Sequence, residues 1–309
     1  MNIQKAIDEC LADLSLASAT EKTYRTGLGS FLLYLSDKNI NASEDVEKLE
    51  VDHFIFFLTW ANKRFSKQTA HVYGAASKSF MDFLVITKRL EISYLDAVRL
   101  KKATLRSNRR REDKLPRFPQ KDDVPRMLAA VRNQNESSPR KERNIAILEF
   151  LASSGCRVSE AINLNIQDID LVNRSTIVTG KGSKERRVFF SPVAAASISA
   201  YWDARKSRMA TDPAFARHDK GAGRKHIKRM TTTAVRNIVK DVALLAGVDT
   251  TKFSPHYFRH AFAIRVLGET GNLALAQDLL GHKDPKATRV YAKIHSEDLQ
   301  KAHRSLFSE

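Results

Sequence analysis

Residues 175–190, "STIVTGKGSKERRVFF", carry the clearest β signal in this 309-residue chain. Two runs rich in β-branched or aromatic residues, 176–179 and 186–190, flank a Gly-Lys-Gly-Ser turn. Such runs on either side of a glycine-containing turn are typical of a β-hairpin. The preceding segment 165–171, "NIQDIDL", can supply a third strand, so we predict a small three-stranded antiparallel sheet.

Helical patterns surround this hairpin on both sides. Helices are expected near residues 121–133 and 143–153, and Gly155 is placed to end the second of them. From about Val193 onward the pattern is helical again, interrupted by a loop at 211–229. Residues 121–309 are therefore predicted to form one mainly helical α+β domain.

Residues 1–103 predict a second domain, an all-α bundle of four or five helices. Apolar side chains spaced by three and four residues line one helix face: Tyr24, Leu28, Phe31, Leu32 and Leu35. Ser18 and Glu21 form a capping-box pattern just before them. Residues 53–63 and 69–86 are further helical candidates, and their aromatic side chains are expected in the core.

A basic segment separates the two domains, and we predict an interdomain linker at residues 104–120. Residues 101–117, "KKATLRSNRRREDKLPR", contain eight basic and two acidic residues, and Pro116 and Pro119 lie at the end of the linker. Such a connector can be simply solvated, or it can lie along a phosphate backbone. Its candidate DNA contacts are Arg109, Arg110 and Arg111.

The charge of the chain is strongly positive and unevenly placed. The net charge is +17, and residues 1–100 hold 12 Lys and Arg against 13 Asp and Glu, so the whole excess lies in residues 101–309. An excess of this size attracts polyanions, of which nucleic acid is the commonest. A basic protein with no special partner is the alternative interpretation.

The cysteines and the apolar runs indicate the compartment. Cys10 and Cys156 are far apart in sequence, which argues against a disulfide framework or a CxxC metal site. No apolar run approaches the roughly 20 residues of a membrane helix, and the N-terminus lacks the apolar core of a signal peptide. We therefore expect a cytoplasmic protein with no membrane partner.

Residues 254–266, "SPHYFRHAFAIRV", predict the start of a helix. Ser254 suits the N-cap and Pro255 suits the first turn. His256 and Arg259 would then share a face of the first turns and meet an anion at the helix N-terminus.

A metal site is the alternative for the two histidines of this stretch. His256 and His260 have the spacing of helical metal ligands, but Tyr257 stands where the zinc-protease motif needs glutamate. No convincing third ligand lies nearby in the sequence. We therefore expect no metal, and we predict a packing or hydrogen-bonding role for His260.

Tyr291 is the candidate nucleophile. Asp284 and Pro285 predict a helix start that places Tyr291 about two turns into the helix. A phenol, with its usual pKa near 10, is a poor nucleophile at neutral pH, but the nearby Lys286 and Arg289 would favour the phenolate. A helical tyrosine alone is more often a core or surface residue, so its role depends on the surrounding motifs.

The motifs occur in the order expected for tyrosine recombinases, the phage-integrase-type family, and the chain resembles that family. The segments that carry the resemblance are "GCRVSE" (155–160), "GKGSKER" (180–186), "PHYFRHAFA" (255–263) and "LLGHKDPKATRVY" (279–291). The histidine, arginine, histidine and tyrosine of the last two motifs are separated by 3, 23 and 9 residues, which is similar to compact bacterial members, including Xer-type recombinases. Phe258 replaces the more usual leucine and remains apolar.

The resemblance extends over essentially the whole chain. Residues 18–35, "SATEKTYRTGLGSFLLYL", resemble the helical, SAM-like core-DNA-binding domain that precedes the catalytic domain in this family. The segment between the hairpin and Ser254 is the least recognisable. The implied architecture is an all-α core-DNA-binding bundle followed by a catalytic domain with a small sheet.

The resemblance implies DNA cleavage and rejoining through a covalent 3′-phosphotyrosine intermediate. It assigns catalytic roles to six residues: Arg157, Lys181, His256, Arg259, His282 and Tyr291. Tyr291 would attack phosphorus, the two arginines would grip the non-bridging oxygens, and the two histidines would add hydrogen bonds and tune protonation.

The role of Lys181 and those of two further side chains have alternatives that stay open. Lys181, in the hairpin turn, is our choice for the general acid that protonates the departing 5′ hydroxyl. Lys184 is the competing candidate and is better suited to a phosphate contact. Glu160 could orient Arg157 or another active-site group, or could be a plain surface carboxylate.

No cofactor is expected. A phosphotyrosine ester conserves the energy of the phosphodiester bond, so rejoining would need no ATP, and "GKGSKE" lacks the P-loop spacing. A cationic site can stabilise the transition state without Mg²⁺, and no clear acidic cluster for two metals is evident.

The expected partner is a double-stranded DNA recombination site, which would make the protein nucleoid-associated. A tail helix from about residue 296, with Leu299, Ala302 and Leu306 on one side, could pack on its own domain. By the resemblance we favour docking on a neighbouring protomer, in a homotetramer that exchanges strands through a Holliday junction. The need for accessory proteins, the target site and the choice between element integration or excision and dimer or cointegrate resolution stay open.

Two other functions are weighed against recombination. A type IB topoisomerase would use the same chemistry as a monomer that relaxes supercoils, but the small helical N-terminal domain and the tail favour recombination. A DNA-binding regulator without catalysis would not require the full Arg/Lys/His/Arg/His/Tyr set in this order.

Overall fold

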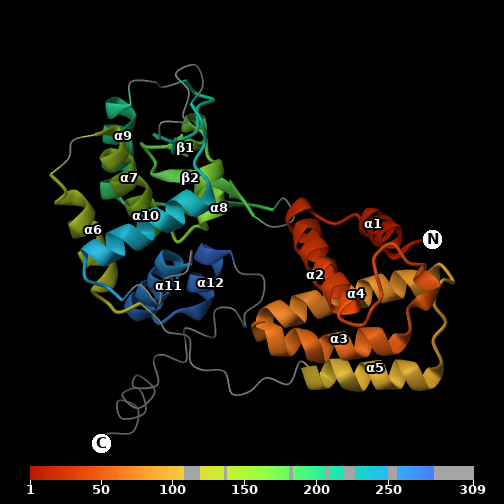
Figure 1. Cartoon of the computed structure of the whole chain (residues 1–309). Helices are drawn as coiled ribbons and strands as arrows, with labels where there is room; N and C mark the ends of the chain where they lie inside the picture. The colour runs from red at the N-terminus through yellow and green to blue at the C-terminus, as the bar shows by residue number, and fades with distance from the viewer. Residues whose placement is uncertain are drawn as a thin grey trace, which may run out of the picture. The chain divides into compact units, whose positions relative to one another are not determined.

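A computed structural model gives the fold. It describes residues 1–107, 119–135, 138–180, 184–205, 209–218, 227–249 and 256–281. The chain forms two compact units, Met1–Lys114 and Leu115–Glu309 (Figure 1). Each unit has its own apolar core. No helix within the described ranges is both long and apolar enough to cross a membrane.

The named elements of the N-terminal unit are all helical. They are α1 (Ile3–Asp13), α2 (Ser18–Ser36), the short 3-10 helix η1 (Val46–Lys48), α3 (Val51–Arg64), α4 (Lys67–Ile86) and α5 (Tyr94–Ser107). Helix α4 packs against α1, α2 and α3, and α3 also contacts α5. The ring of Phe31 lies 4.9 Å from that of Phe54 and 5.1 Å from that of Phe57, so the aromatic side chains form the core, as predicted.

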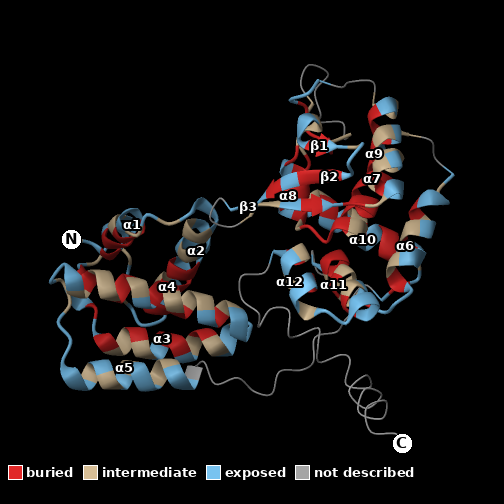
Figure 2. Cartoon of the chain, turned by 180° about the vertical axis from the view of Figure 1, so that it is seen from behind, coloured by how far each residue is buried: buried red, intermediate tan, exposed pale blue. Residues whose placement is uncertain are grey.

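Two sequence expectations for this unit are wrong in detail. Ala17 and not Ser18 is the N-cap of α2, so Ser18 is the first helical residue and its side chain does not cap the helix. Glu21 pairs with an arginine one turn later. Helix α5 continues to Ser107, past the predicted start of the linker at residue 104. Lys, Arg, Leu and Ala are good helix formers, so a basic composition does not end a helix. No described side chain of α5 is fully buried (Figure 2).

The second unit combines helices with a small sheet. Its elements are α6 (Asp123–Arg132), α7 (Pro139–Ser154), α8 (Val158–Asn163), the 3-10 helix η2 (Ile166–Asp168), β1 (Ile169–Asp170), β2 (Ser175–Thr179), β3 (Glu185–Phe189), α9 (Pro192–Ala204), α10 (Thr232–Leu245), α11 (Tyr257–Thr270) and α12 (Leu273–Leu280).

The predicted three-stranded sheet is confirmed. Its strands are antiparallel in the order β1-β2-β3, and Val178 pairs with Arg186 across the hairpin. Because side chains alternate along a strand, Arg186 lies on the same face of β3 as the buried Val188, whereas Arg187 is exposed. At the base of the turn the Gly180 N–H donates a 2.7 Å hydrogen bond to the Lys184 carbonyl oxygen.

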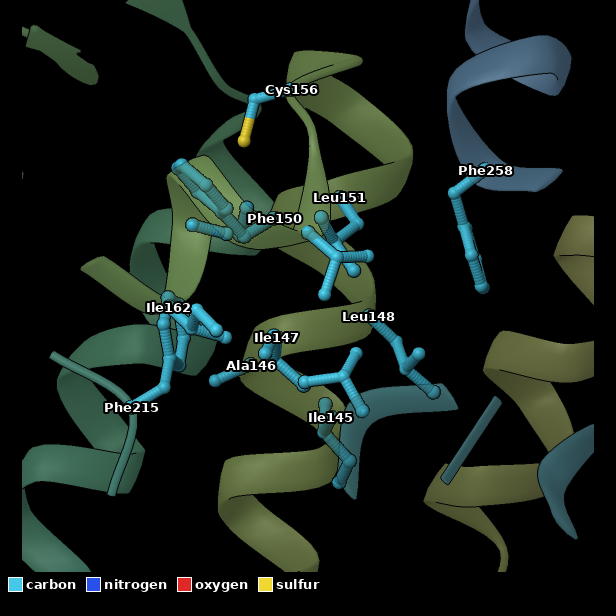
Figure 3. Close-up of a cluster of buried hydrophobic side chains, with 14 of the residues drawn as sticks. Ile145, Ala146, Ile147, Leu148, Phe150, Leu151, Cys156, Ile162, Phe215 and Phe258 are labelled. Carbon is cyan, nitrogen blue, oxygen red and sulfur yellow. The ribbon is translucent and has the colours of Figure 1, made fainter. Parts of the chain in front are cut away.

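Helix α7 lies at the centre of this unit. It contacts α6, α8, α9, α11 and β3. Ala146, Ile147, Leu148 and Phe150 are completely buried, as expected for a helix that is covered on several sides. Figure 3 shows these side chains together with Ile162 and Phe215, which come from other parts of the unit.

Candidate active site

The turn between α7 and α8 presents Arg157. Helix α7 ends at Ser154, and Gly155 follows in the left-handed conformation, with φ of 62°. A Cβ at this position would lie 2.3 Å from Phe262 Cδ1, so both the backbone angle and the space require glycine. The chain then turns into α8 at Arg157, which is partly exposed and directly precedes the helix.

Glu160 lies in the first turn of α8 and is buried between two arginines. The backbone N–H and Nη1 of Arg157 donate to its carboxylate at 2.7 and 2.8 Å, and Nη1 and Nη2 of Arg186 each donate at 2.8 Å. Burial alone would raise the pKa of Glu160, but these donors outweigh it and lower the pKa to about 2. The carboxylate is therefore charged at neutral pH and holds the Arg157 side chain.

Arg186 is a member of this cluster that our sequence interpretation did not single out. It stands in a run of charged residues, from Lys184 to Arg187, in which composition does not distinguish one basic side chain from another. The alternation of side chains along β3 could have identified it. Arg186 stands two positions before the apolar Val188, and residues two apart on a strand lie on the same face.

Helix α11 places His256 and Arg259. It begins at Tyr257 with His256 as the cap residue, whereas the predicted start at Ser254 and Pro255 lies outside the described residues. Arg259 is buried, with 4% of its surface exposed. Its Nη1 donates to the Gly155 carbonyl oxygen at 2.8 Å, and its Nη2 donates to the Leu280 carbonyl oxygen at 2.5 Å. The phosphate contact expected for Arg259 stays a prediction.

The histidines of α11 lie in a strongly cationic environment. Partial burial lowers the pKa of His256, and the Arg259 and Arg157 cations lower it further, so this ring is neutral at pH 7. The His260 ring centroid lies 6.2 Å from that of His256, and burial, His256 and Arg259 lower the pKa of His260 to about 4. Within the described ranges, no three His, Cys, Asp or Glu side chains gather in a way that could hold a metal ion.

A buried hydrogen bond fixes the start of α11 to the start of α6. The Tyr257 hydroxyl donates to Asp123 Oδ2 at 2.5 Å, and the Gln120 N–H donates to the same oxygen at 2.9 Å. Because Tyr257 directly follows His256, this contact holds the segment that presents the histidine. Nothing in the sequence predicted this hydrogen bond, because we used Tyr257 only as an argument against a zinc motif.

The remaining predicted residues lie mostly outside the described ranges. Lys181, His282 and Tyr291 lie outside the described residues, as do Arg109, Arg110 and Arg111. Lys184 is described and exposed at the base of the hairpin. The described residues Gly180 and Gly281 directly precede Lys181 and His282, and both glycines lie near the Glu160–Arg186 pair.

The described parts of all four predicted motifs thus converge in one place. A comparison with known families shows which family the chain belongs to. The model of the phage integrase family matches residues 117–298. The chain belongs to the phage integrase family. The resemblance seen in the sequence is confirmed, and the protein is a tyrosine recombinase of the Xer type, a DNA strand-transferring enzyme.

Curated relatives of the family match over nearly the full chain. The tyrosine recombinase XerD of Oceanobacillus iheyensis is 31% identical over 292 residues, which cover 94% of this chain and 92% of the relative. The tyrosine recombinase XerC of Pediococcus pentosaceus is 29% identical over 300 residues, which cover 93% and 92%.

Solved structures of tyrosine recombinases share the fold. The XerH site-specific recombinase bound to a palindromic difH substrate in a post-cleavage complex superposes with a TM-score of 0.73 at 22% identity, covering 97% of this chain and 88% of that one. The Tn1549 transposon integrase in complex with transposon right end DNA gives a TM-score of 0.70 at 14% identity, covering 97% and 100%.

Proposed function

We propose that this phage integrase family member cleaves and rejoins a specific DNA site through a covalent phosphotyrosine formed by Tyr291. One observation carries the proposal. Arg157 and the pair His256 and Arg259 are about 100 residues apart in the chain, yet the fold brings them together in one cationic centre. Such a centre suits the negative charge that develops on the non-bridging oxygens of a phosphodiester under attack.

The proposed cleavage step is a transesterification. The Tyr291 phenolate oxygen attacks phosphorus while the bond from phosphorus to the 5′ oxygen breaks, and Lys181 gives its proton to the departing 5′ oxygen. Arg157 binds a non-bridging oxygen, and the neutral His256 can donate a hydrogen bond to the same group. Rejoining is the reverse attack by a 5′ hydroxyl, which releases the tyrosine.

We propose that the reaction uses neither ATP nor a resident metal. The phosphotyrosine ester keeps the energy of the broken phosphodiester, so the reverse step needs no external energy source. The side-chain cations at the site supply the charge that a metal would otherwise provide. Cleavage that stops when divalent ions are chelated would contradict this part of the proposal.

DNA and further copies of the chain, in a homotetramer, are the proposed partners. The two units would contact one duplex recombination site, the N-terminal unit as the core-DNA-binding domain, and four protomers would exchange strands through a Holliday junction. A groove of about 950 Å³ bordered by α6, α7 and α11 offers apolar walls, including Leu128 and Phe262, to the tail of a neighbouring protomer. Truncation after residue 295 should then keep half-site binding and abolish synapsis, as measured by band shift.

A nicked suicide substrate with the recognition site tests the chemistry. The wild type should give a covalent adduct on denaturing gels, and Tyr291→Phe should give none. An adduct that persists in Tyr291→Phe would refute the nucleophile, and band shift without any adduct would indicate a binding protein. Relaxation of plasmids that lack the site would favour a topoisomerase.

A further inference from the structure

The Glu160 carboxylate is a junction between two predicted catalytic segments. It accepts four hydrogen bonds, two from Arg157 and two from Arg186, and only 4% of the residue is exposed. A guanidinium that donates two parallel hydrogen bonds to one carboxylate is fixed in both distance and plane. The paired hydrogen bonds of Arg186 therefore bind strand β3 to the first turn of α8 in a fixed direction.

The hairpin turn begins at Gly180, next to the contact between Glu160 and Arg186. A Cβ built at Gly180 would lie 3.6 Å from Glu160 Oε1 and 3.9 Å from Arg186 Nη1, so the glycine backbone lies against the ion pair. The hydrogen bond from the Gly180 N–H to the Lys184 carbonyl oxygen closes the base of the turn at 2.7 Å. Lys181 is the next residue in the chain.

The other side of Arg186 is held by the end of α12. A Cβ at Gly281 would lie 2.5 Å from Arg186 Cδ and 2.9 Å from its Nε, so only a glycine leaves room for the arginine stem. Gly281 also has a φ of 63°, which favours glycine. The arginine is thus enclosed by Glu160 on one side and the Gly281 turn on the other, and it has little freedom to move.

We propose that Arg186 is a positioning residue that, through Glu160, holds the base of the β2–β3 hairpin at Gly180 and Lys184, and that the general-acid step assigned to Lys181 depends on this hold. The inference rests on the proposed function, because Lys181 matters only if it protonates the leaving group. Arg186 acts through Glu160 and Gly180 and does not touch the reacting atoms. Misplacing a catalytic group by about 1 Å can cost on the order of 100-fold in rate.

A direct contact between Arg186 and a DNA phosphate is the competing explanation. Nε of Arg186 is buried and has no hydrogen-bond partner among the described residues. A phosphate contact would contribute to DNA affinity, and its loss would lower the slope of log affinity against log salt by about 0.9. A positioning residue would leave that slope unchanged.

The decisive experiment compares two leaving groups. Single-turnover cleavage is measured with an ordinary suicide substrate and with one that carries sulfur in place of the bridging 5′ oxygen at the scissile bond. A thiol has a pKa near 8.5 and leaves as the thiolate, so it needs no general acid. Arg186→Gln should be slowed by about 100-fold on the oxygen substrate and should recover to near the wild-type rate on the sulfur substrate. Arg157→Ala should stay slow on both, because it acts on the phosphoryl oxygens.

Matched variants exclude a merely structural effect. Arg187→Gln removes the neighbouring charge on the exposed face of β3 and should leave both cleavage rates unchanged. Arg186→Lys keeps a cation but loses the paired contact, and its oxygen-substrate rate should lie between those of the wild type and Arg186→Gln. Arg186→Gln should add little to the defect of Glu160→Gln, because both remove the same contact.

The outcomes separate the two proposals. If Lys181→Met recovers on the sulfur substrate and Arg186→Gln does not, the positioning role of Arg186 is overturned and the general acid stands. If Lys181→Met does not recover, the assignment of the general acid fails, and the role of Arg186 fails with it. A salt slope that falls by about 0.9 in Arg186→Gln would also overturn the proposal in favour of a phosphate contact.

Discussion

Arg259 Nη1 lies 2.8 Å from the carbonyl oxygen of Gly155, and through this bond helix α11 is joined to the end of α7. The second guanidinium nitrogen of Arg259 donates to the Leu280 carbonyl oxygen at the end of α12. The last carbonyls of a helix lack partners within the helix and carry partial negative charge, so one buried guanidinium satisfies two helix ends. Arg259 therefore holds the ends of α7 and α12 together at the site and also gives the site positive charge.

Replacing Arg259 by lysine should destabilise the catalytic unit. A single ammonium cannot reach the Gly155 and Leu280 carbonyls together, and hydrogen bonds that involve a charged group contribute about 1.5 to 3 kcal/mol each. Urea unfolding of Arg259→Lys should show a loss in this range or above. The same exchange at the exposed Arg265 on α11 is the control and should change stability by less than about 0.5 kcal/mol. Equal effects at both positions would refute the assembling role.

Gly155→Ala should cost more stability than Gly271→Ala. Both glycines have φ near 60°, so both alanines carry the left-handed strain of about 1 to 2 kcal/mol. Only at Gly155 would the new Cβ also meet a neighbour, Phe262, at 2.3 Å, whereas no atom lies within 4 Å at Gly271. Overpacking should add about 1 to 3 kcal/mol to the loss at Gly155, measured by urea unfolding. A smaller loss at Gly155 than at Gly271 would contradict the close approach of α11.

Tyr257→Phe should weaken the hold on the start of α11. Removing the hydroxyl deletes its 2.5 Å hydrogen bond to Asp123, a bond to a charged group worth about 1.5 to 3 kcal/mol. We expect a loss of unfolding free energy in this range together with slower cleavage, because His256 is adjacent. In an Asp123→Asn background the further effect of Tyr257→Phe should shrink by at least about 0.5 kcal/mol. Full additivity of the two changes would rule out the coupling.

His260 should make stability fall in mild acid. Its folded-state pKa is lowered to about 4 from an ordinary value of 6.5, so the unfolded chain binds the proton first as the pH falls. The stability that the neutral His260 ring contributes is fully present above pH 6.5 and is lost as the pH falls toward 4. The free energy of unfolding then decreases by at most about 1.4 kcal/mol per pH unit. Urea unfolding at several pH values should show a shallower decline between pH 6.5 and 4 for His260→Gln than for the wild type. Parallel pH profiles would exclude His260 as the titrating group.

Local patterns in the sequence predicted much of the fold. The β-branched runs around the Gly-Lys-Gly-Ser turn and the three- and four-residue apolar spacings near Phe31 each depend on neighbours in the chain, and the sheet and helices follow them. The exact ends were less predictable. Helix α5 runs on to Ser107 because its basic residues favour a helix, and α2 starts without the side-chain cap expected at Ser18.

The sequence by itself determined the family, the order of the motifs and the residue types of the site, because these are properties of the chain read in one dimension. Only the tertiary structure decided which charges meet. Arg186 and Arg187 are adjacent and chemically identical, yet the pleat of β3 turns the first toward the buried Glu160 and leaves the second exposed. Arg259 is likewise committed to two carbonyls that lie 104 and 21 residues away in the chain. Contacts over such separations are made by packing, which no local pattern encodes.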